Sequence, residues 1–327
     1  MRTTRIITAS EIRPVFGMKE AVESVENAFI LYGQGDVQMP PKVYMTFDAG
    51  DLRTMPVYMP TMGIAGVKNV NVHPANTDVP PVMATITLVD PADGFPLAIM
   101  DGTYVTNMRT GAAGGVAAKY LARADSEVVG FVGAGHQAHT QLEALCITMG
   151  NIKAVVVFDP NREMTEDLCK VASVRHGLEA VRAADLGQVV SRADIVVTTT
   201  PVRDPIVEDE WVRPGTHINA IGADAAGKQE LDPAILKRAC VVIDNWEQAS
   251  HSGEVNVPLS TGAITREDIA CDIGELLTGR GTGRQGPDDI SVFDSTGLAV
   301  QDISCAFAAY RKLQVQPSTR LREVAFF

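Results

Sequence analysis

The chain has 327 residues, of which 46% are apolar and 21% are charged, and its formal net charge is −12. This composition is that of a globular protein, and the length fits about two domains of roughly 150 residues each. The acidic balance argues against a nucleic-acid surface, because phosphate binding needs clustered Lys and Arg. No apolar run approaches the ~20 residues of a membrane span and no secretory signal opens the chain, so we expect a cytoplasmic protein.

The cysteines also indicate a reducing compartment. They are odd in number, far apart and without CxxC spacing: Cys146, Cys169, Cys240, Cys271 and Cys305. This pattern favours neither a zinc site nor a disulfide framework, and we expect reduced thiols.

The first hundred residues predict a mixed α+β unit. The opening residues read into a polar helix start, and an apolar stripe at helical spacing predicts one helix over residues 10–32. From 42 to 100 the pattern changes to short β-rich runs separated by turn residues.

A second domain follows, in which strands and helices alternate. A small-residue-rich helix at 110–122 leads into it, and a Gly-rich segment at 279–286 reads as a surface loop. Continuous apolar strands are expected at 128–132, 154–158, 195–199, 217–221, 240–243 and 290–293, with helices at 138–149 and 162–176 between them. Such strands indicate a parallel sheet covered on both faces. A final helix at 298–313 is placed to return to the first domain.

The strongest motif is a glycine turn at 128–138. It has the form G-x-G-x-x-A, directly after an apolar strand and before a helix. Gly133 permits the tight turn, Gly135 lets a pyrophosphate approach the backbone, and Ala138 lets the helix pack close to the strand. Alone this match is weak, since an ordinary strand-turn-helix would also fit.

The next strand supports the interpretation of this motif as a dinucleotide site. It ends at Asp159, where an acid would accept hydrogen bonds from ribose hydroxyls. An Arg there would indicate a 2′-phosphate, so NAD is favoured over NADP. The alternative is that Asp159 merely caps a helix before Pro160. The predicted fold class is therefore α/β: a doubly wound (Rossmann) parallel-sheet domain at 119–299, plus an α+β substrate-binding and dimerisation domain at 1–118 and 300–327.

Three cations of the first domain are candidates for binding an acidic substrate. Lys68 ends an apolar run, so it is either an edge residue whose amine reaches solvent or a functional amine. Arg53 follows Asp51-Leu52, and Arg109 precedes the Gly/Ala-rich helix, where it could equally be a surface cation.

Polar residues also follow several strands of the second domain. Residues 198–201 put threonines at a strand end, Asp224 follows a later strand, and residues 293–297 repeat this arrangement. Strand ends border the ligand crevice in such sheets. A β-favouring threonine run and an ordinary turn aspartate are the alternatives. The six histidines form no metal-binding set, and no metal is expected.

The order of these segments resembles the ornithine cyclodeaminase/mu-crystallin family, and within it most closely the archaeal alanine dehydrogenases. The similar segments are residues 38–44, 51–53, 109–115, 198–201, 217–224 with 227–228, and 293–299.

The resemblance implies an NAD-dependent oxidoreductase whose substrate is a small amino or keto acid. It also implies a homodimer that forms through the first domain. It implies the following roles. Substrate would be bound by Arg53, Lys68 and Arg109, and the catalytic residues would be Lys68 and Asp224. The cofactor would be bound by Arg109, Gly133, Gly135, His136, Gln137, Asp159, Thr200, Ala220, Asp224, Lys228 and Ser295.

One departure bears on the substrate. Cyclodeaminases have an acid close before a Met-Pro pair to hold ornithine's distal ammonium, whereas this chain has Arg53-Thr54 before Met55-Pro56. A cation there suits a short substrate, so we expect reversible oxidative deamination of L-alanine to pyruvate and ammonium. A cyclodeaminase, a ketimine reductase and a non-enzymatic mu-crystallin-like binding protein are the alternatives.

In the expected mechanism, Arg53 and Arg109 clamp the carboxylate, which aims the Cα–H at the nicotinamide. The two guanidinium groups should lower the pKa of Lys68 by like-charge repulsion, so that it can act as a base near neutral pH. Lys68 or Asp224 then guides water onto the iminium carbon.

Overall fold

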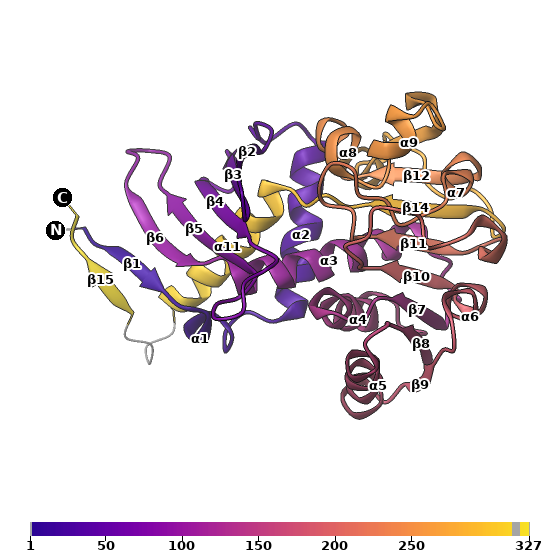
Figure 1. Ribbon diagram of the computed structural model, residues 1–327. Coiled ribbons are helices and arrows are strands. Elements are labelled where there is room, and N and C mark those ends of the chain that lie inside the picture. The colour runs from indigo at the N-terminus through magenta and orange to yellow at the C-terminus, as the bar shows by residue number, and fades with distance from the viewer. Residues whose placement is uncertain (1, 316–320, 327) are drawn as a thin grey trace. The chain divides into compact units, whose positions relative to one another are not determined.

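The computed structural model describes residues 2–315 and 321–326, and the chain forms two compact units. Unit 1 comprises the chain up to Arg109 and again from Leu298, and unit 2 comprises Thr110–Gly297. Each unit has a sheet of its own (Figure 1). None of the helices in the described residues is long and apolar enough to cross a bilayer.

The sheet of unit 1 has the strand order β15-β1-β6-β5-β4-β3-β2. Strands β1 and β6 pair in parallel, and the other neighbours pair antiparallel. The strands are β1 (Thr4–Ile7), β2 (Val43–Phe47), β3 (Gly50–Met59), β4 (Ile64–Val72), β5 (Val82–Val89), β6 (Pro96–Asp101) and β15 (Arg322–Val324).

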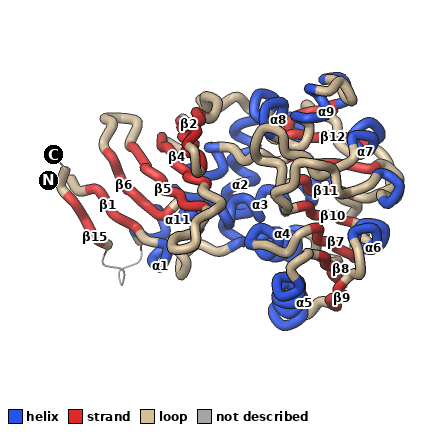
Figure 2. Tube along the Cα trace, in the orientation of Figure 1, coloured by secondary structure: helices blue, strands red, loops and turns tan. Residues whose placement is uncertain are grey.

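One face of this sheet is covered by helix α11 (Ala299–Gln314), which packs on β3, β4 and β5 and against α2 (Met18–Gly33). In Figure 2, α11 crosses behind these strands. Along β3 and β4 every second residue is buried, as expected where only one face meets a core. The register aligns Met55, Lys68, Ile86 and Met100 in one buried row on the covered face. A lysine therefore lies inside an apolar row.

The predicted helix over 10–32 is wrong in one respect, because it is two helices. Helix α1 (Ala9–Ile12) ends before Pro14, and α2 begins only at Met18, with Gly17 in the extended conformation as its N-cap. A proline inside a helix lacks the N–H and collides with the preceding turn, so the break falls there. The opening segment is also a strand, β1, rather than a helix start.

The helix expected at 110–122 begins earlier, at Thr103, and forms α3 (Thr103–Leu121), which continues from unit 1 into unit 2. Asp101 supplies its start by accepting a hydrogen bond from the Tyr104 N–H at 2.8 Å. The β-branched residues in its first turns hid this start in the sequence. Farther along, a Cβ at Gly111 would lie 2.4 Å from the Thr140 carbonyl oxygen, so only glycine allows this approach to α4 (His136–Thr148).

Unit 2 contains an entirely parallel sheet of order β13-β12-β14-β11-β10-β7-β8-β9. Its strands are β7 (Val128–Val132), β8 (Ala154–Phe158), β9 (Glu179–Arg182), β10 (Ile195–Thr198), β11 (His217–Ala220), β12 (Ala239–Ile243), β13 (Ile269–Asp272) and β14 (Ile290–Asp294). Strands β9 and β13 were not predicted, since both are short and partly polar. After β9 the chain crosses to the other side of β7, and the carboxyl ends of β7 and β10 flank this switch point.

Two cores cover the two faces of this sheet. One joins α4 and α5 (Arg162–His176) to alternate strand residues such as Phe131 and Val157. The other joins α6 (Leu186–Arg192), α7 (Pro233–Arg238) and α8 (Trp246–Ser252) to intervening residues such as Val156 and Val196. A short helix, α9 (Asn256–Ser260), and another, α10 (Ile273–Leu277), complete the unit. The predicted doubly wound domain accompanied by an α+β domain is confirmed.

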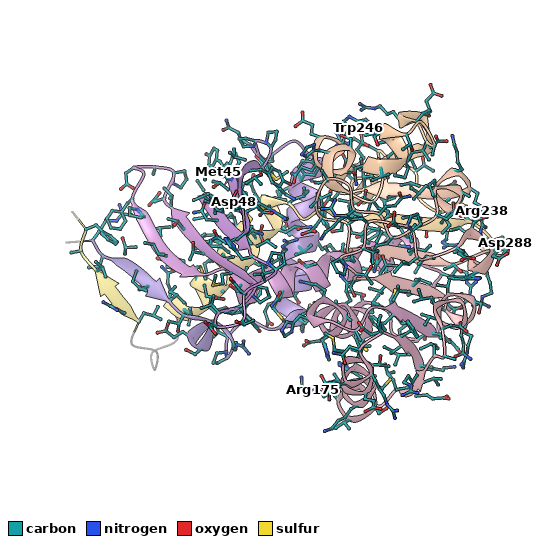
Figure 3. All side chains as sticks on the ribbon, viewed as in Figure 1. Met45, Asp48, Arg175, Arg238, Trp246 and Asp288 are labelled. Carbon is teal, nitrogen blue, oxygen red and sulfur yellow. The ribbon has the colours of Figure 1, made fainter. Side chains whose placement is uncertain are left out.

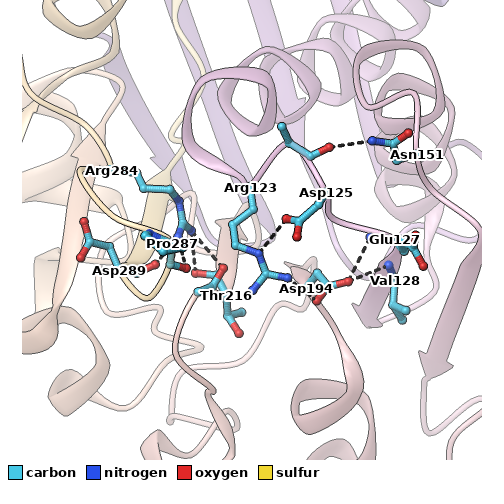
Figure 4. A network of polar contacts seen from close by, with 12 residues as sticks. Arg123, Asp125, Glu127, Val128, Asn151, Asp194, Thr216, Arg284, Pro287 and Asp289 are labelled. Carbon is cyan, nitrogen blue, oxygen red and sulfur yellow. Dashed lines mark hydrogen bonds and ion pairs between the residues drawn. The ribbon is translucent and has the colours of Figure 1, made fainter.

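Polar contacts lock the amino-terminal edge of the sheet in unit 2 (Figure 4). Arg284 donates to the carbonyl oxygens of Leu121 at 2.6 Å and Thr216 at 3.3 Å, which fixes the Gly-rich loop. Arg123 donates to the Asp194 carboxylate at 3.1 Å. Ligands of such sheets bind at the opposite, carboxyl edge.

Candidate active site

Lys68 lies on β4, in the middle of the sheet of unit 1, and is 1% exposed. Its Nζ is 2.6 Å from Oδ2 of Asp302, which lies in the first turn of α11 and is itself fully buried. An amine that reaches solvent from a sheet edge is therefore the wrong interpretation of Lys68.

Arg109 joins the same cluster from α3. Its Nε donates to Oδ1 of Asp302 at 2.9 Å, and its Nη1 donates to Oε1 of Gln301 at 3.1 Å. The side chain of Arg109 is buried, so it is not a surface cation. One carboxylate thus holds two cations and fixes where both point.

Burial lowers the pKa of Lys68 from 10.5 to about 7. The Asp302 carboxylate opposes this shift, and the positive charges of Arg109 and Lys42 add to it. The lowered pKa agrees with the sequence-based prediction, but its main cause is desolvation rather than repulsion by two arginines. At neutral pH the amine is present in both protonation states, as a proton-transferring group requires.

Arg53 lies two residues before Met55 on β3, on the same covered face of the sheet, and is also buried. Its Nε and Nη2 form a fork onto the Asp51 carboxylate at 2.9 and 3.1 Å. Asp51 is thus engaged with a guanidinium, which leaves it poorly placed to hold the distal ammonium of a diamino acid.

Gln301 carries a buried polar atom that is not satisfied. Its Oε1 accepts from Leu298 N at 3.0 Å and from Arg109, whereas its Nε2 has no hydrogen-bond partner within the described residues. Buried donors in native proteins normally have a partner, and a bound anion is one way to supply it. The cluster can therefore receive a carboxylate beside an amine that titrates near neutrality.

In unit 2, the glycine turn has the geometry that its sequence predicts. Gly133 has a φ of 93°, a conformation that side chains rarely adopt. Gly135 is the N-cap of α4, without a capping side chain, and a Cβ there would meet only Met164 at 3.8 Å. The first amides of α4, those of His136 and Gln137, are thus placed to face an anion. This backbone fits the pyrophosphate of a dinucleotide.

Asp159 follows β8 and supports this turn. Its carboxylate accepts from the Ala134 N–H at 2.9 Å and from the Asn161 N–H at 2.7 Å. The N-cap of α5 is Asn161, so the interpretation of Asp159 as the helix cap is wrong.

A cavity of about 190 Å³ opens beside Asp159. It is lined by Phe158, Asp159, Arg162, Thr165, Arg182, Ala183 and Ala184. Both of its arginines pair with Glu166, Arg162 at 2.6 Å and Arg182 at 3.7 Å. The cavity therefore offers carboxylates as well as cations to a ligand.

Three of the predicted cofactor-binding residues lie at the carboxyl ends of adjacent strands. Thr200 follows β10, Ala220 ends β11, and Ser295 follows β14, with its N–H donating to the Ala220 carbonyl at 3.1 Å. The Oγ of Ser295 is buried and without a hydrogen-bond partner among the described residues. It can therefore bond to a ligand at this edge.

Asp224 and Lys228 form an ion pair, with Lys228 Nζ 2.6 Å from Asp224 Oδ1. The Asp224 side chain is 39% exposed, so it is reachable by a small molecule. The described residues contain no group of three His, Cys, Asp or Glu side chains arranged to hold a metal ion.

Several residues of these two clusters were not singled out from the sequence. Asp302 and Gln301 fall within a helical pattern that reads as ordinary packing, and Lys42 lies in a loop. Glu230 accepts a hydrogen bond from Thr200, but the sequence around it matches no motif that would have indicated this contact. Only the rarity of charged residues at buried helix positions could have marked Asp302.

The parallel sheet, the glycine turn at its switch point and the acid after β8 define a dinucleotide-binding protein with a second, α+β unit. The chain belongs to the ornithine cyclodeaminase/mu-crystallin family, whose model matches residues 2–316.

Similar proteins and solved structures agree with this family assignment. The chain is 50% identical over 311 residues to the alanine dehydrogenase of Archaeoglobus fulgidus, covering 94% of each protein. It is 32% identical over 314 residues to a Delta(1)-pyrroline-2-carboxylate reductase of Bacillus cereus, covering 94% of this chain and 96% of that one. The solved structure of an archaeal alanine dehydrogenase dimer with bound NAD matches with a TM-score of 0.94 and 46% identity over 100% of both chains.

The Lys68 amine should make stability depend on pH. Because burial lowers its pKa to about 7 from 10.5, the unfolded chain binds more protons between these values. The free energy of unfolding should therefore rise with pH in this window, relative to Lys68→Met, by up to about 1.4 kcal/mol per pH unit.

Urea unfolding of both proteins between about pH 7.5 and pH 9.5 measures this difference. Lys170→Met, which removes an exposed lysine of α5, is the matched control. A difference in the free energy of unfolding between wild type and Lys68→Met that stays constant across the interval would contradict a buried amine that titrates near pH 7.

Proposed function

We propose that this protein is an NAD-dependent alanine dehydrogenase, which converts L-alanine, NAD⁺ and water to pyruvate, ammonium, NADH and a proton, reversibly. One observation carries the proposal: the buried Lys68 amine, whose pKa is about 7, is held by Asp302 beside Arg109. The 50% identity to an alanine dehydrogenase supports the choice of substrate.

Unit 1 would bind the substrate. The guanidinium of Arg109 and the Nε2 of Gln301 would hold the carboxylate, with Arg53 contributing from β3. Neutral Lys68 would take the proton from the substrate ammonium, so that the free amine can release a hydride from Cα. Lys68 or Asp224 would then deliver water to the carbon of the resulting iminium.

Unit 2 would bind NAD, which supplies the hydride acceptor. The glycine turn would hold the pyrophosphate, and Asp159 would accept hydrogen bonds from the ribose. Asp159, which follows β8, supports NAD over NADP, because its carboxylate would repel a 2′-phosphate. Solved relatives carry NADH, in Thermococcus litoralis Delta(1)-pyrroline-2-carboxylate reductase, and NAD⁺, in Paracoccus denitrificans iminosuccinate reductase. The five free thiols support a cytoplasmic location.

The direct test is a panel of amino acids with NAD⁺, followed by NADH absorbance and by product analysis. We expect net NADH and pyruvate with L-alanine. Proline formed from ornithine without net NADH would instead select a cyclodeaminase. NADH consumption with cyclic imines but none with pyruvate and ammonium would select an imine reductase, and tight ligand binding without turnover would select a binding protein.

Removing the Lys68 amine should abolish most of the activity. We expect Lys68→Ala to lower kcat for alanine about 10²–10⁴-fold, the usual effect of losing an acid/base group, while NAD⁺ still binds because its site lies on unit 2. Lys170→Ala, at an exposed position on α5, is the control and should keep its activity. Near-normal turnover by Lys68→Ala would refute the assigned role.

We also infer that the protein is a homodimer that pairs through unit 1. The sheet face opposite α11 carries a half-buried row in which Thr87 is flanked by the apolar residues Pro56, Val67 and Ile99. On the edge strand β2, the same face exposes Val43, Met45 and Phe47 by 57%, 47% and 46% (Figure 3 labels Met45). Apolar surface of this extent normally marks an interface.

A charge placed on this face should separate the subunits. Ile99→Glu, on β6, would have to bury an unpaired carboxylate in the interface, so we expect a monomer by sedimentation velocity. The control is Val174→Glu, since Val174 on α5 is 76% exposed and should tolerate a charge without a change in mass. A dimeric Ile99→Glu protein would exclude this face.

A further inference from the structure

Glu230 is fully buried in unit 2 and accepts four hydrogen bonds. Its Oε1 accepts from the N–H and the hydroxyl of Thr200, both at 2.7 Å. Its Oε2 accepts from the hydroxyl of Thr198 at 2.6 Å and from the N–H of Gly222 at 2.9 Å. Both oxygens therefore have their full complement of donors.

These donors come from two neighbouring strands. Thr198 ends β10 and Thr200 follows it, whereas Gly222 follows β11. The carboxylate thus ties together two strand ends at the ligand-binding edge of the sheet. A Cβ at Gly222 would lie 2.6 Å from Oε1 of Glu230, so glycine is needed there for the contact.

The Thr200 hydroxyl is oriented by this contact. Its hydrogen is donated to Glu230, which leaves only the oxygen lone pairs to face a ligand. Thr200 is therefore fixed as an acceptor, which suits the amide N–H₂ of a carboxamide.

A second buried acid, Glu254, lies behind the first. Its carboxylate accepts from the backbone N–H of Glu230 at 3.0 Å and from that of Leu231 at 2.7 Å. Burial, together with the negative charges of Glu230 and Asp294, raises the pKa of Glu254 well above its usual value. Burial also raises the pKa of Glu230, but its four donors oppose that shift. All four groups around Glu230 donate to it, and two of them are backbone N–H groups that can only donate, so its contacts are those of an ionised carboxylate.

We propose that ionised Glu230 is a positioning residue for the nicotinamide end of the dinucleotide: it fixes Thr200 and the chain after β11, and its charge favours the oxidised, cationic ring over the reduced, neutral ring. This inference rests on the proposed binding of NAD. At an effective dielectric of about 20, a charge several ångströms from the ring changes binding on the order of tenfold.

The test is the ratio of dissociation constants for NAD⁺ and NADH, measured by calorimetry on the full chain without substrate. In Glu230→Gln the shape is kept and the charge is lost, so we expect the ratio of the NAD⁺ constant to the NADH constant to rise about tenfold. A purely structural role would weaken both forms by the same factor. An unchanged ratio would therefore overturn the proposal, whereas failure of the wild-type protein to bind either form would overturn the proposed function itself.

Glu254→Gln is the matched control, because this carboxyl contacts the backbone of Glu230 and Leu231 rather than Thr200, and the ratio should change much less than in Glu230→Gln. If Glu230→Gln does not fold, the same ratio is measured for Thr198→Val instead. This substitution removes one donor from Oε2 and so favours the neutral form of Glu230, which should raise the ratio above that of the wild-type protein at the same pH. A Thr198→Val ratio equal to that of the wild-type protein at every pH would overturn the proposal.

Discussion

The ion pair between Lys68 and Asp302 is the constraint on which unit 1 depends. A lysine in the middle of a buried apolar row would be strongly destabilising without a partner, because an ammonium in a core loses its hydration. The partner is not on the sheet but on α11, near the end of the chain. The first and last parts of the chain must therefore pack together before the charge is compensated, which explains why unit 1 is built from both.

The fold could be predicted where one local pattern decides it. The apolar strands β7, β8 and β10 and the helix α5 were recognised because their runs are long and their ends are marked. The predicted helix over 10–32 failed because its apolar stripe continues past Pro14, where the backbone cannot. The start of α3 was missed because its first turns contain β-branched residues and its capping residue, Asp101, ends a strand.

The candidate site was predicted less completely than the fold, for a physical reason. Gly133 and Asp159 act through local backbone geometry, which a motif records. Asp302 and Glu230 act through contacts with residues distant in sequence, and nothing in their own neighbourhoods indicates those partners. Lys68 falls between these cases: its apolar surroundings suggest burial, but only the tertiary structure shows that burial, rather than the arginines, lowers its pKa most.

The two units compensate a buried charge in opposite ways, Lys68 with one partner and Glu230 with four donors. This difference matches the chemistry proposed for each residue. Lys68 has one acidic partner, which offsets only part of the cost of burial, so its proton is held loosely enough to be exchanged near neutral pH. Glu230 has four donors, two of them backbone amides that cannot reorient, so its charge is held in place. A base must change its charge during turnover, whereas a group that biases cofactor binding must not. The number and rigidity of the hydrogen bonds around each group therefore decide which task it can perform.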